Sequence, residues 1–232
     1  MPVSRLLSRV RSEESGFTLV ELLVACIIGM VILLATFMML DSSVVLTGKV
    51  TDRVDRTQRA RVAMEDITRK LRSQVCPSPG SGALVDAQDY SVTFYSFLGT
   101  HPFVPDKRQI AWDTNTHSII ESVWAGSGAS PNTTWAATPT TRTILSDVQP
   151  PFVSGTSGPR GPMFQYYAAG ASSPFATPLA ATDLSATSRI TINFMVYAQS
   201  QNLTGNTTTL QDEVYARTAD PNAAGTIAPV CA

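Results

Sequence analysis

An unbroken hydrophobic stretch near the start of the chain is the strongest pattern in the sequence. From Leu22 to Leu40 no residue carries a charge. A helix rises about 1.5 Å per residue, so this run crosses most of a hydrocarbon core that is roughly 30 Å thick. Glu21 stands directly before the run, and an unpaired carboxylate in lipid costs on the order of a few kcal/mol. We therefore predict a transmembrane helix over residues 17–40, and we expect Glu21 to need a partner.

The same helix is predicted to continue as an amphipathic one over residues 41–75, because no proline interrupts the chain from Phe17 to Val75. Apolar residues recur there at mostly three- and four-residue intervals, which gives one apolar stripe. The stripe consists of Val50, Val54, Met64, Ile67, Leu71 and Val75. The opposite face carries acids four residues before bases, the favourable order for helix ion pairs. The expected pairs are Asp52–Arg56, Asp55–Arg59, Glu65–Arg69 and Asp66–Lys70.

Short segments rich in β-branched and aromatic residues follow the helix. Pro77 disfavours helical geometry at Cys76, so we place a domain boundary there. The predicted strands are 90–97, 108–112, 118–124, 141–145, 163–167, 189–197 and 213–217, with the second and third forming a hairpin. Polar loops are expected at 99–107, 125–140, 150–162, 170–187 and 199–211. The pattern predicts an α+β fold, in which an antiparallel sheet of the β-rich domain 76–232 covers the helix stripe.

Composition narrows the classes of function. Only 15% of the 232 residues are charged and the net charge is −1, so the chain has no general basic field for nucleic acid. Gly, Pro, Ser and Thr are plentiful beyond residue 76, which suits a loop-rich domain outside the cell. The strand aromatics could stack on DNA, but core packing is the better interpretation without a basic groove. We expect no nucleic-acid partner, although a role in DNA uptake stays among the alternatives.

Candidate catalytic and metal-binding residues are few. His101 and His117 lie on separate segments, without Cys, Asp or Glu at a spacing typical of zinc. Ser127 and Ser157 lie in glycine-containing turns, but neither belongs to a full nucleophile elbow. The sequence contains no phosphate-binding or dinucleotide-binding glycine pattern. We therefore expect no enzymatic activity, no cofactor and no metal.

The residues at the start of the apolar run resemble a known family. Gly16 is followed by Phe17, Thr18, Leu19, Val20 and Glu21 and then by the apolar helix, and over about residues 12–40 this order resembles the type IV prepilin signature. The resemblance implies that prepilin peptidase cleaves between Gly16 and Phe17 and that the new terminus is N-methylated. Residues 1–16 would then be a leader peptide. The three arginines of the leader place this end in the cytoplasm by the positive-inside rule.

The same resemblance implies a partner for Glu21. Cleavage would free an amino group at Phe17, which has a reference pKa of about 8 and is largely protonated, about one helical turn from Glu21. The pair could form within one chain, or between chains, where it would set the axial register of one subunit on another. The alternative is a glutamate at the level of the lipid headgroups without a partner.

A narrower resemblance indicates the subtype. Four segments are similar to the sequence run of PilW/PulJ-type minor pilins and J-type pseudopilins: 61–72, 164–167, 189–192 and 213–217. Met38 stands where the best-known major pilins often have a helix-kinking proline, which argues against a major pilin. Residues 13–15, Glu-Glu-Ser, stand where many leaders have a basic residue, but Gly16 is intact.

The three cysteines have different expected roles. Cys26 lies inside the apolar helix, where it is interpreted as a small packing residue. Cys76 and Cys231 could form a disulfide in an oxidising compartment and tie the C-terminal tail to the end of the helix, and the family often has a disulfide near its C-terminus. The alternative is two free thiols.

Taken together, these features predict a structural subunit. After processing at Gly16 it would assemble, through its N-terminal helix, with other pilin or pseudopilin subunits into a type IV pilus or a type II secretion-like pseudopilus. Before processing it would be a single-pass membrane protein with a cytoplasmic N-terminus and an extracytoplasmic C-terminal domain. The alternative is a single-pass anchored extracellular binding protein that does not assemble.

Overall fold

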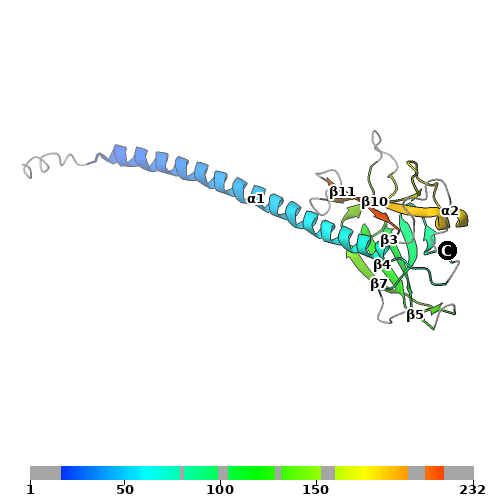
Figure 1. The fold of residues 1–232 in the computed structure, drawn as a ribbon. Helices are drawn as coiled ribbons and strands as arrows, with labels where there is room; N and C mark the ends of the chain where they lie inside the picture. Colours follow the sequence, from blue (N-terminus) through cyan, green and yellow to red (C-terminus); the bar gives the residue numbers. More distant parts are fainter. Residues whose placement is uncertain are drawn as a thin grey trace, which may run out of the picture. The chain divides into compact units, whose positions relative to one another are not determined.

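The structure is a computed structural model, and it describes residues 17–78, 81–98, 104–128, 132–152, 160–197 and 207–216. The chain divides into two compact units, Met1–Val50 and Thr51–Ala232. Figure 1 shows the long helix α1 (Leu19–Arg72) and, later in the chain, the antiparallel strands and the short helix α2 (Ala181–Ala186). The α+β fold predicted from the sequence is confirmed. The leader, residues 1–16, lies outside the described residues.

Helix α1 accounts for both halves of the predicted helix. In the N-terminal unit it extends to Val50, and all of its residues there are exposed. It ends at Arg72 rather than at Val75, because the backbone turns toward strand β2 (Ser91–Ser96). Gln74 forms an isolated bridge with Ser96, and the N–H of Val75 donates to the carbonyl of Tyr95 at 3.0 Å.

The first sheet has five antiparallel strands in the order β1-β2-β3-β4-β7. Besides β2, its strands are β1 (Leu84–Ala87), β3 (Asp106–Asp113), β4 (Ser118–Trp124) and β7 (Thr140–Leu145). The predicted hairpin is confirmed, since β3 and β4 pair from Lys107–Trp124 to Asp113–Ser118. The pairing of β1 with β2 shifts register between Leu84 and Asp86, which leaves a bulge at Val85.

The second sheet is organised around the longest strand, β10 (Thr187–Tyr197). One edge of β10 pairs with β11 (Thr207–Tyr215). Its other edge pairs with β9 (Phe164–Ala168) along its first half and with β8 (Val148–Gln149) near its end. The predicted strands 163–167, 189–197 and 213–217 are confirmed as elements, with longer bounds for the last two.

Some loops predicted from the sequence contain regular structure. A small hairpin of β5 (Gly126–Ser127) and β6 (Thr134–Trp135) lies inside the expected loop 125–140. Helix α2 lies inside 170–187, and β3 and β11 begin within two other expected loops. These elements are short or polar, so alternation of hydrophobic residues does not mark them. Their backbone groups find partners only in the folded chain.

The hydrophobic core of the second unit lies among α1 and the two sheets. The predicted core packing of strand aromatics is confirmed for Phe94, Phe164, Tyr166 and Phe194, which are fully buried. Ile67 and Leu71 of α1 are buried in the same cluster. The predicted stripe was wrong in its N-terminal part, because Val50 and Val54 are exposed, and Ala60 and Ala63 are buried instead. The second unit begins at Thr51; the proposed domain boundary at residue 76 stays a prediction.

Candidate functional site

The first turn of α1 is held by Thr18. The Oγ1 of Thr18 accepts a hydrogen bond from the backbone N–H of Glu21 at 3.3 Å, and its carbonyl accepts one from Leu22 at 3.2 Å. Thr18 therefore occupies the N-cap position, and Glu21 stands three residues later, the order of a capping box. The sequence analysis treated Thr18 only as part of the signature and missed this role, although the Thr-x-x-Glu spacing indicates it.

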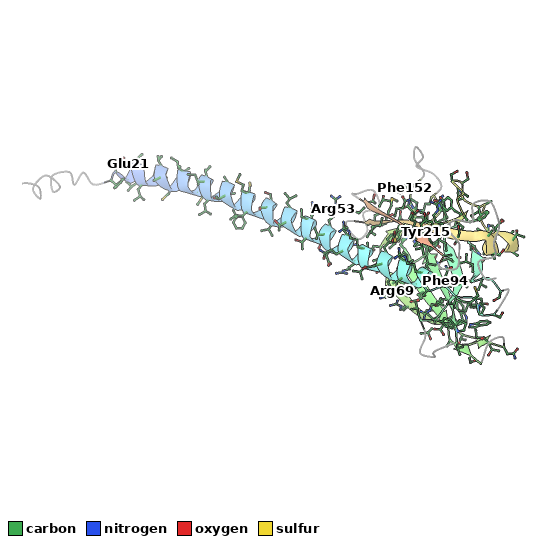
Figure 2. The ribbon with its side chains drawn as sticks, viewed as in Figure 1. Glu21, Arg53, Arg69, Phe94, Phe152 and Tyr215 are labelled. Atoms are coloured by element: carbon green, nitrogen blue, oxygen red, sulfur yellow. The ribbon has the colours of Figure 1, made fainter. Side chains whose placement is uncertain are left out.

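Glu21 is exposed, and the cap bonds its backbone rather than its side chain. Figure 2 labels Glu21 near the beginning of α1. A carboxylate at this end of a helix is favoured by the partial positive charge of the unpaired N–H groups. Glu21 stands four residues after Phe17, the residue that would carry the amino terminus after cleavage.

The N-terminal half of α1 presents an apolar surface on every side. Large hydrophobic side chains from Leu19 to Leu46 are half or more exposed around the whole helix. An apolar surface of this size is stable only against lipid or against other apolar helices. Of the helices that the structure describes, α1 is the one long and apolar enough to cross a membrane.

Three hydroxyl groups in this half of α1, those of Thr36, Ser42 and Thr47, are paired within the helix. Thr36 donates to the carbonyl of Ile32, and Ser42 donates to that of Met39 at 3.0 Å. Thr47 donates to the carbonyl of Ser43 at 2.8 Å. Because each hydroxyl is paired inside its own helix, it needs no water and can be placed in an apolar environment.

Residues 11–37 match the prokaryotic N-terminal methylation motif. The match includes Gly16, Phe17 and Glu21, and it supports a type IV pilin-like protein. This motif implies processing by prepilin peptidase and assembly with other pilins. Together with the single apolar helix, it fits a membrane-anchored, single-pass protein. No curated protein matches the chain.

A second group of functional side chains joins α1 to the five-stranded sheet. We call it the Glu121 cluster, and it comprises Asp66 and Lys70 of α1, Asp106 and Arg108 of β3, Glu121 of β4 and Arg142 of β7. The three carboxylates and three basic groups balance in charge. A balanced and fully paired cluster avoids the large cost of burying a lone ion.

Glu121 is the centre of this cluster. Its Oε2 lies 2.7 Å from Lys70 Nζ, its Oε1 lies 2.9 Å from Arg108, and Oε2 also accepts from Arg142 Nε. Lys70 is further bonded to Asp66 at 2.7 Å. One carboxylate thus connects the helix with three adjacent strands of the sheet.

Burial and hydrogen bonding act in opposite directions on the acids of the cluster. Burial alone would raise the pKa of the Glu121 carboxyl, but hydrogen bonds from Lys70 and Arg142 outweigh it and lower that pKa below its ordinary value. The pKa of Asp66 is lowered in the same way, against its burial, by Lys70 and Arg69. The hydrogen bond to Glu121 raises the pKa of Arg142. These shifts favour the charged forms of Glu121, Asp66 and Arg142 at neutral pH.

The sequence analysis found only part of this arrangement. The predicted pairs Asp66–Lys70 and Asp55–Arg59 are present. The other two were wrong: Arg56 instead binds Asp147 at 3.0 Å. Arg69 binds Asp66 rather than Glu65, at 2.6 Å. The fold brings Asp147 to Arg56, whereas Arg69 pairs with the acid three residues before it on the same helix. Glu121 itself was missed, although an acid on the buried face of a strand is a signal for a buried partner.

The cysteines are only partly described. Cys26 is an exposed free thiol on α1. Cys76 is disulfide-bonded. Its predicted partner, Cys231, lies outside the described residues, so the pairing of Cys76 with Cys231 stays a prediction.

The remaining candidate residues form no chemical site in the part of the chain that the structure describes. His117 packs near Trp112, with ring centroids 6.2 Å apart, while His101 lies outside the described residues. The Oγ of Ser127 lies 2.9 Å from the Oγ1 of Thr134 across the small hairpin. Ser157 is outside the described residues. No group of three or more His, Cys, Asp or Glu side chains is placed to hold a metal within the described ranges.

Proposed function

We propose that this chain is a structural, non-catalytic minor pilin or pseudopilin subunit. One observation carries the proposal: the methylation motif leads directly into a helix whose apolar side chains are exposed on all sides. In the precursor this helix would be held in lipid. After cleavage behind Gly16 it would move into a bundle of like helices, which replaces lipid contacts with helix contacts of similar polarity.

Glu21 would serve assembly through its charge. The cap from Thr18 engages only the backbone of Glu21, so the carboxylate is available to the amino group at Phe17 of a neighbouring subunit. Such a pair in apolar surroundings favours one stagger of subunits over others, because any other stagger leaves two buried ions unpaired.

The Glu121 cluster supports the same role at the other end of α1. A helix that is drawn into a fibre must carry its domain with it. Ion pairs from α1 to β4 and β7 would transmit that force to the sheet, beyond what the apolar contacts of Ile67 and Leu71 provide. The domain would then be exported and displayed outside the cytoplasm.

The subtype proposal is narrower. The segments similar to PilW/PulJ-type minor pilins fall on the C-terminal half of α1 and on β9, β10 and β11. These elements form the helix end and the second sheet. We take this as support for a minor component of a type IV pilus or of a type II secretion-like pseudopilus.

The terminus of the mature chain tests processing. Mass spectrometry of the chain purified from cells that contain the peptidase should give an N-terminal peptide that begins with N-methylated Phe17. A chain that still begins at Met1, or at any residue other than Phe17, would contradict the proposal. That result would favour the alternative, an anchored binding protein that does not assemble.

Two variants separate charge from helix capping. Glu21→Gln removes the charge but retains the capping box, and we expect normal cleavage with loss of the subunit from sheared fibres. Thr18→Ala removes the cap, at about 1 kcal/mol, but retains the charge, and we expect it to assemble. If Glu21→Gln assembles as well as wild type, Glu21 has no charge-pairing role in assembly.

A further inference from the structure

A cleft at one edge of the five-stranded sheet has no role in the proposed assembly. It has a volume of about 350 Å³ and is lined by residues before and in β1, by Tyr95 of β2 and by two residues at the β5–β6 hairpin. The lining consists of Pro77, Ser78, Ser81, Gly82, Leu84, Val85, Tyr95, Thr133 and Trp135. Volumes of roughly 300–1,000 Å³ are typical of sites for small ligands. The cleft lies entirely within the second compact unit.

Two aromatic rings form one wall of this cleft. Tyr95 and Trp135 are stacked, with ring centroids 4.8 Å apart and an angle of 29° between the ring planes. The indole N–H of Trp135 donates to the carbonyl of Pro105 at 3.0 Å, so this polar group is already paired. What Trp135 offers to a ligand is therefore a flat ring face rather than a donor.

The hairpin that carries Trp135 is held in place by the segment before β3. The N–H of Gly126 donates to Asp106 Oδ1 at 3.1 Å, and a Cβ at Gly126 would lie 2.2 Å from the carbonyl oxygen of Pro105. Only glycine permits this close approach. Since Asp106 also belongs to the Glu121 cluster, the aromatic wall is preorganised by the buried part of the domain, which lowers the entropy cost of binding.

The lining of the cleft decides which chemical class fits. None of the residues that line it is charged, which disfavours the phosphate backbone of a nucleic acid. The adjacent edge strand β1 is four residues long and bulged at Val85, which disfavours pairing with an added peptide strand. The lining also includes Ser78 and Ser81, so polar groups lie beside the aromatic wall.

We propose that this cleft binds a neutral carbohydrate. A sugar ring presents weakly positive C–H groups on one face, which suit the negative face of an aromatic ring, and hydroxyls at its rim. In this arrangement the sugar ring would stack on the Tyr95–Trp135 pair, and the hydroxyls at its rim would face Ser78 and Ser81 of the lining. The proposal is independent of fibre assembly, because it concerns only the β-rich part of the chain.

Binding is tested with the full mature chain in a detergent without a sugar headgroup. The probes are cellotriose, maltotriose and chitotriose, and the readout is saturation-transfer NMR together with tryptophan fluorescence. We expect at least one trisaccharide to bind. Trp135→Ala should weaken that binding about tenfold, because the stacking face is lost. The absence of binding for all three probes would overturn the proposal.

Two further variants make the test specific to the cleft. Gly82→Phe should block binding without unfolding the chain, because a Cβ at Gly82 meets its nearest atom, the carbonyl oxygen of Leu84, at an ordinary 3.4 Å. Trp124→Ala is the matched control: Trp124 is a partly exposed tryptophan of the same sheet, stacked under Lys107 and outside the cleft, and its loss should leave affinity unchanged. Equal losses in Trp124→Ala and Trp135→Ala, or binding that survives Gly82→Phe, would contradict the proposal. So would equal binding of a thymidine oligonucleotide that depends on Trp135.

Discussion

Lys70 of α1 and Glu121 of β4 form a buried ion pair, with Lys70 Nζ 2.7 Å from Glu121 Oε2 and side chains only 5% and 1% exposed. Both partners have additional bonds within the Glu121 cluster, so neither charge is left alone. The pair lies between the amphipathic half of α1 and the middle of the first sheet. Among the described residues, it is the ion pair between α1 and the first sheet whose two side chains are least exposed.

Breaking this pair from one side should strongly destabilise the domain. Lys70→Met leaves Glu121 and Asp66 with fewer cations in a buried site, and we expect a loss of about 3–5 kcal/mol in the free energy of unfolding. Urea unfolding of the full chain in detergent measures it. The double variant Lys70→Met with Glu121→Leu should recover part of the loss. If Lys70→Met alone is as stable as wild type, the ion pair does not stabilise the domain.

The cluster should also make stability depend on pH. The folded-state pKa values of Glu121 and Asp66 lie below their ordinary values, so their contribution is present above the pKa of the unfolded chain, about 4. It is lost as the pH falls through the lower folded-state pKa. We therefore expect unfolding free energy to decline below about pH 4. Glu121→Gln should show a smaller decline than wild type when both are unfolded at a series of pH values.

The corrected helix stripe gives a matched pair of variants. Ile67 is fully buried in the core cluster, and Ile67→Ala should cost about 2–5 kcal/mol through the cavity that it leaves. Val54 was predicted in the same stripe, but it is 50% exposed, so Val54→Ala should change the free energy of unfolding by less than about 0.5 kcal/mol. Similar losses in both variants would place Val54 in the core after all.

The disulfide prediction can be checked directly. Mass mapping of the non-reduced, protease-digested chain should give a linked peptide that contains Cys76 and Cys231. Cys231→Ser should then cost about 2–4 kcal/mol, because the unfolded chain loses a long cross-link. Cys26→Ser is the control, and it should have no such effect, since Cys26 is a free thiol. A peptide that links Cys76 to any other residue would refute the pairing.

The N-terminal helix could be predicted in detail from the local pattern of charged, apolar and proline residues. The charge-free run after Glu21 and the absence of proline predict α1, and the structure begins it at Leu19. Strands such as β4 and β10 were predictable because alternation of their residues reflects one buried face. The cap by Thr18 could also have been found, since a capping box needs only residues three apart.

The partners of charged side chains were not predictable in this way. Arg56 and Arg69 each have an acid four residues before them, yet each binds a different acid in the structure. The small hairpin with Trp135 likewise has no hydrophobic alternation, and its position depends on Gly126 against Pro105. The Arg56–Asp147 pair and the position of the hairpin depend on residues far apart in the chain, whereas Arg69 pairs with Asp66, another neighbour on its own helix.

By itself, the amino-acid sequence determined that this chain carries a methylation motif, a membrane-length helix and an antiparallel β-rich domain, because each of these follows from spacing within one segment. Only the tertiary structure decided where the helix stripe is buried, which carboxylate gathers three basic groups, and that Tyr95 and Trp135 line one cleft. The physical reason is that burial and ion pairing depend on which strands and helix faces meet, and that choice is made by packing of the whole core.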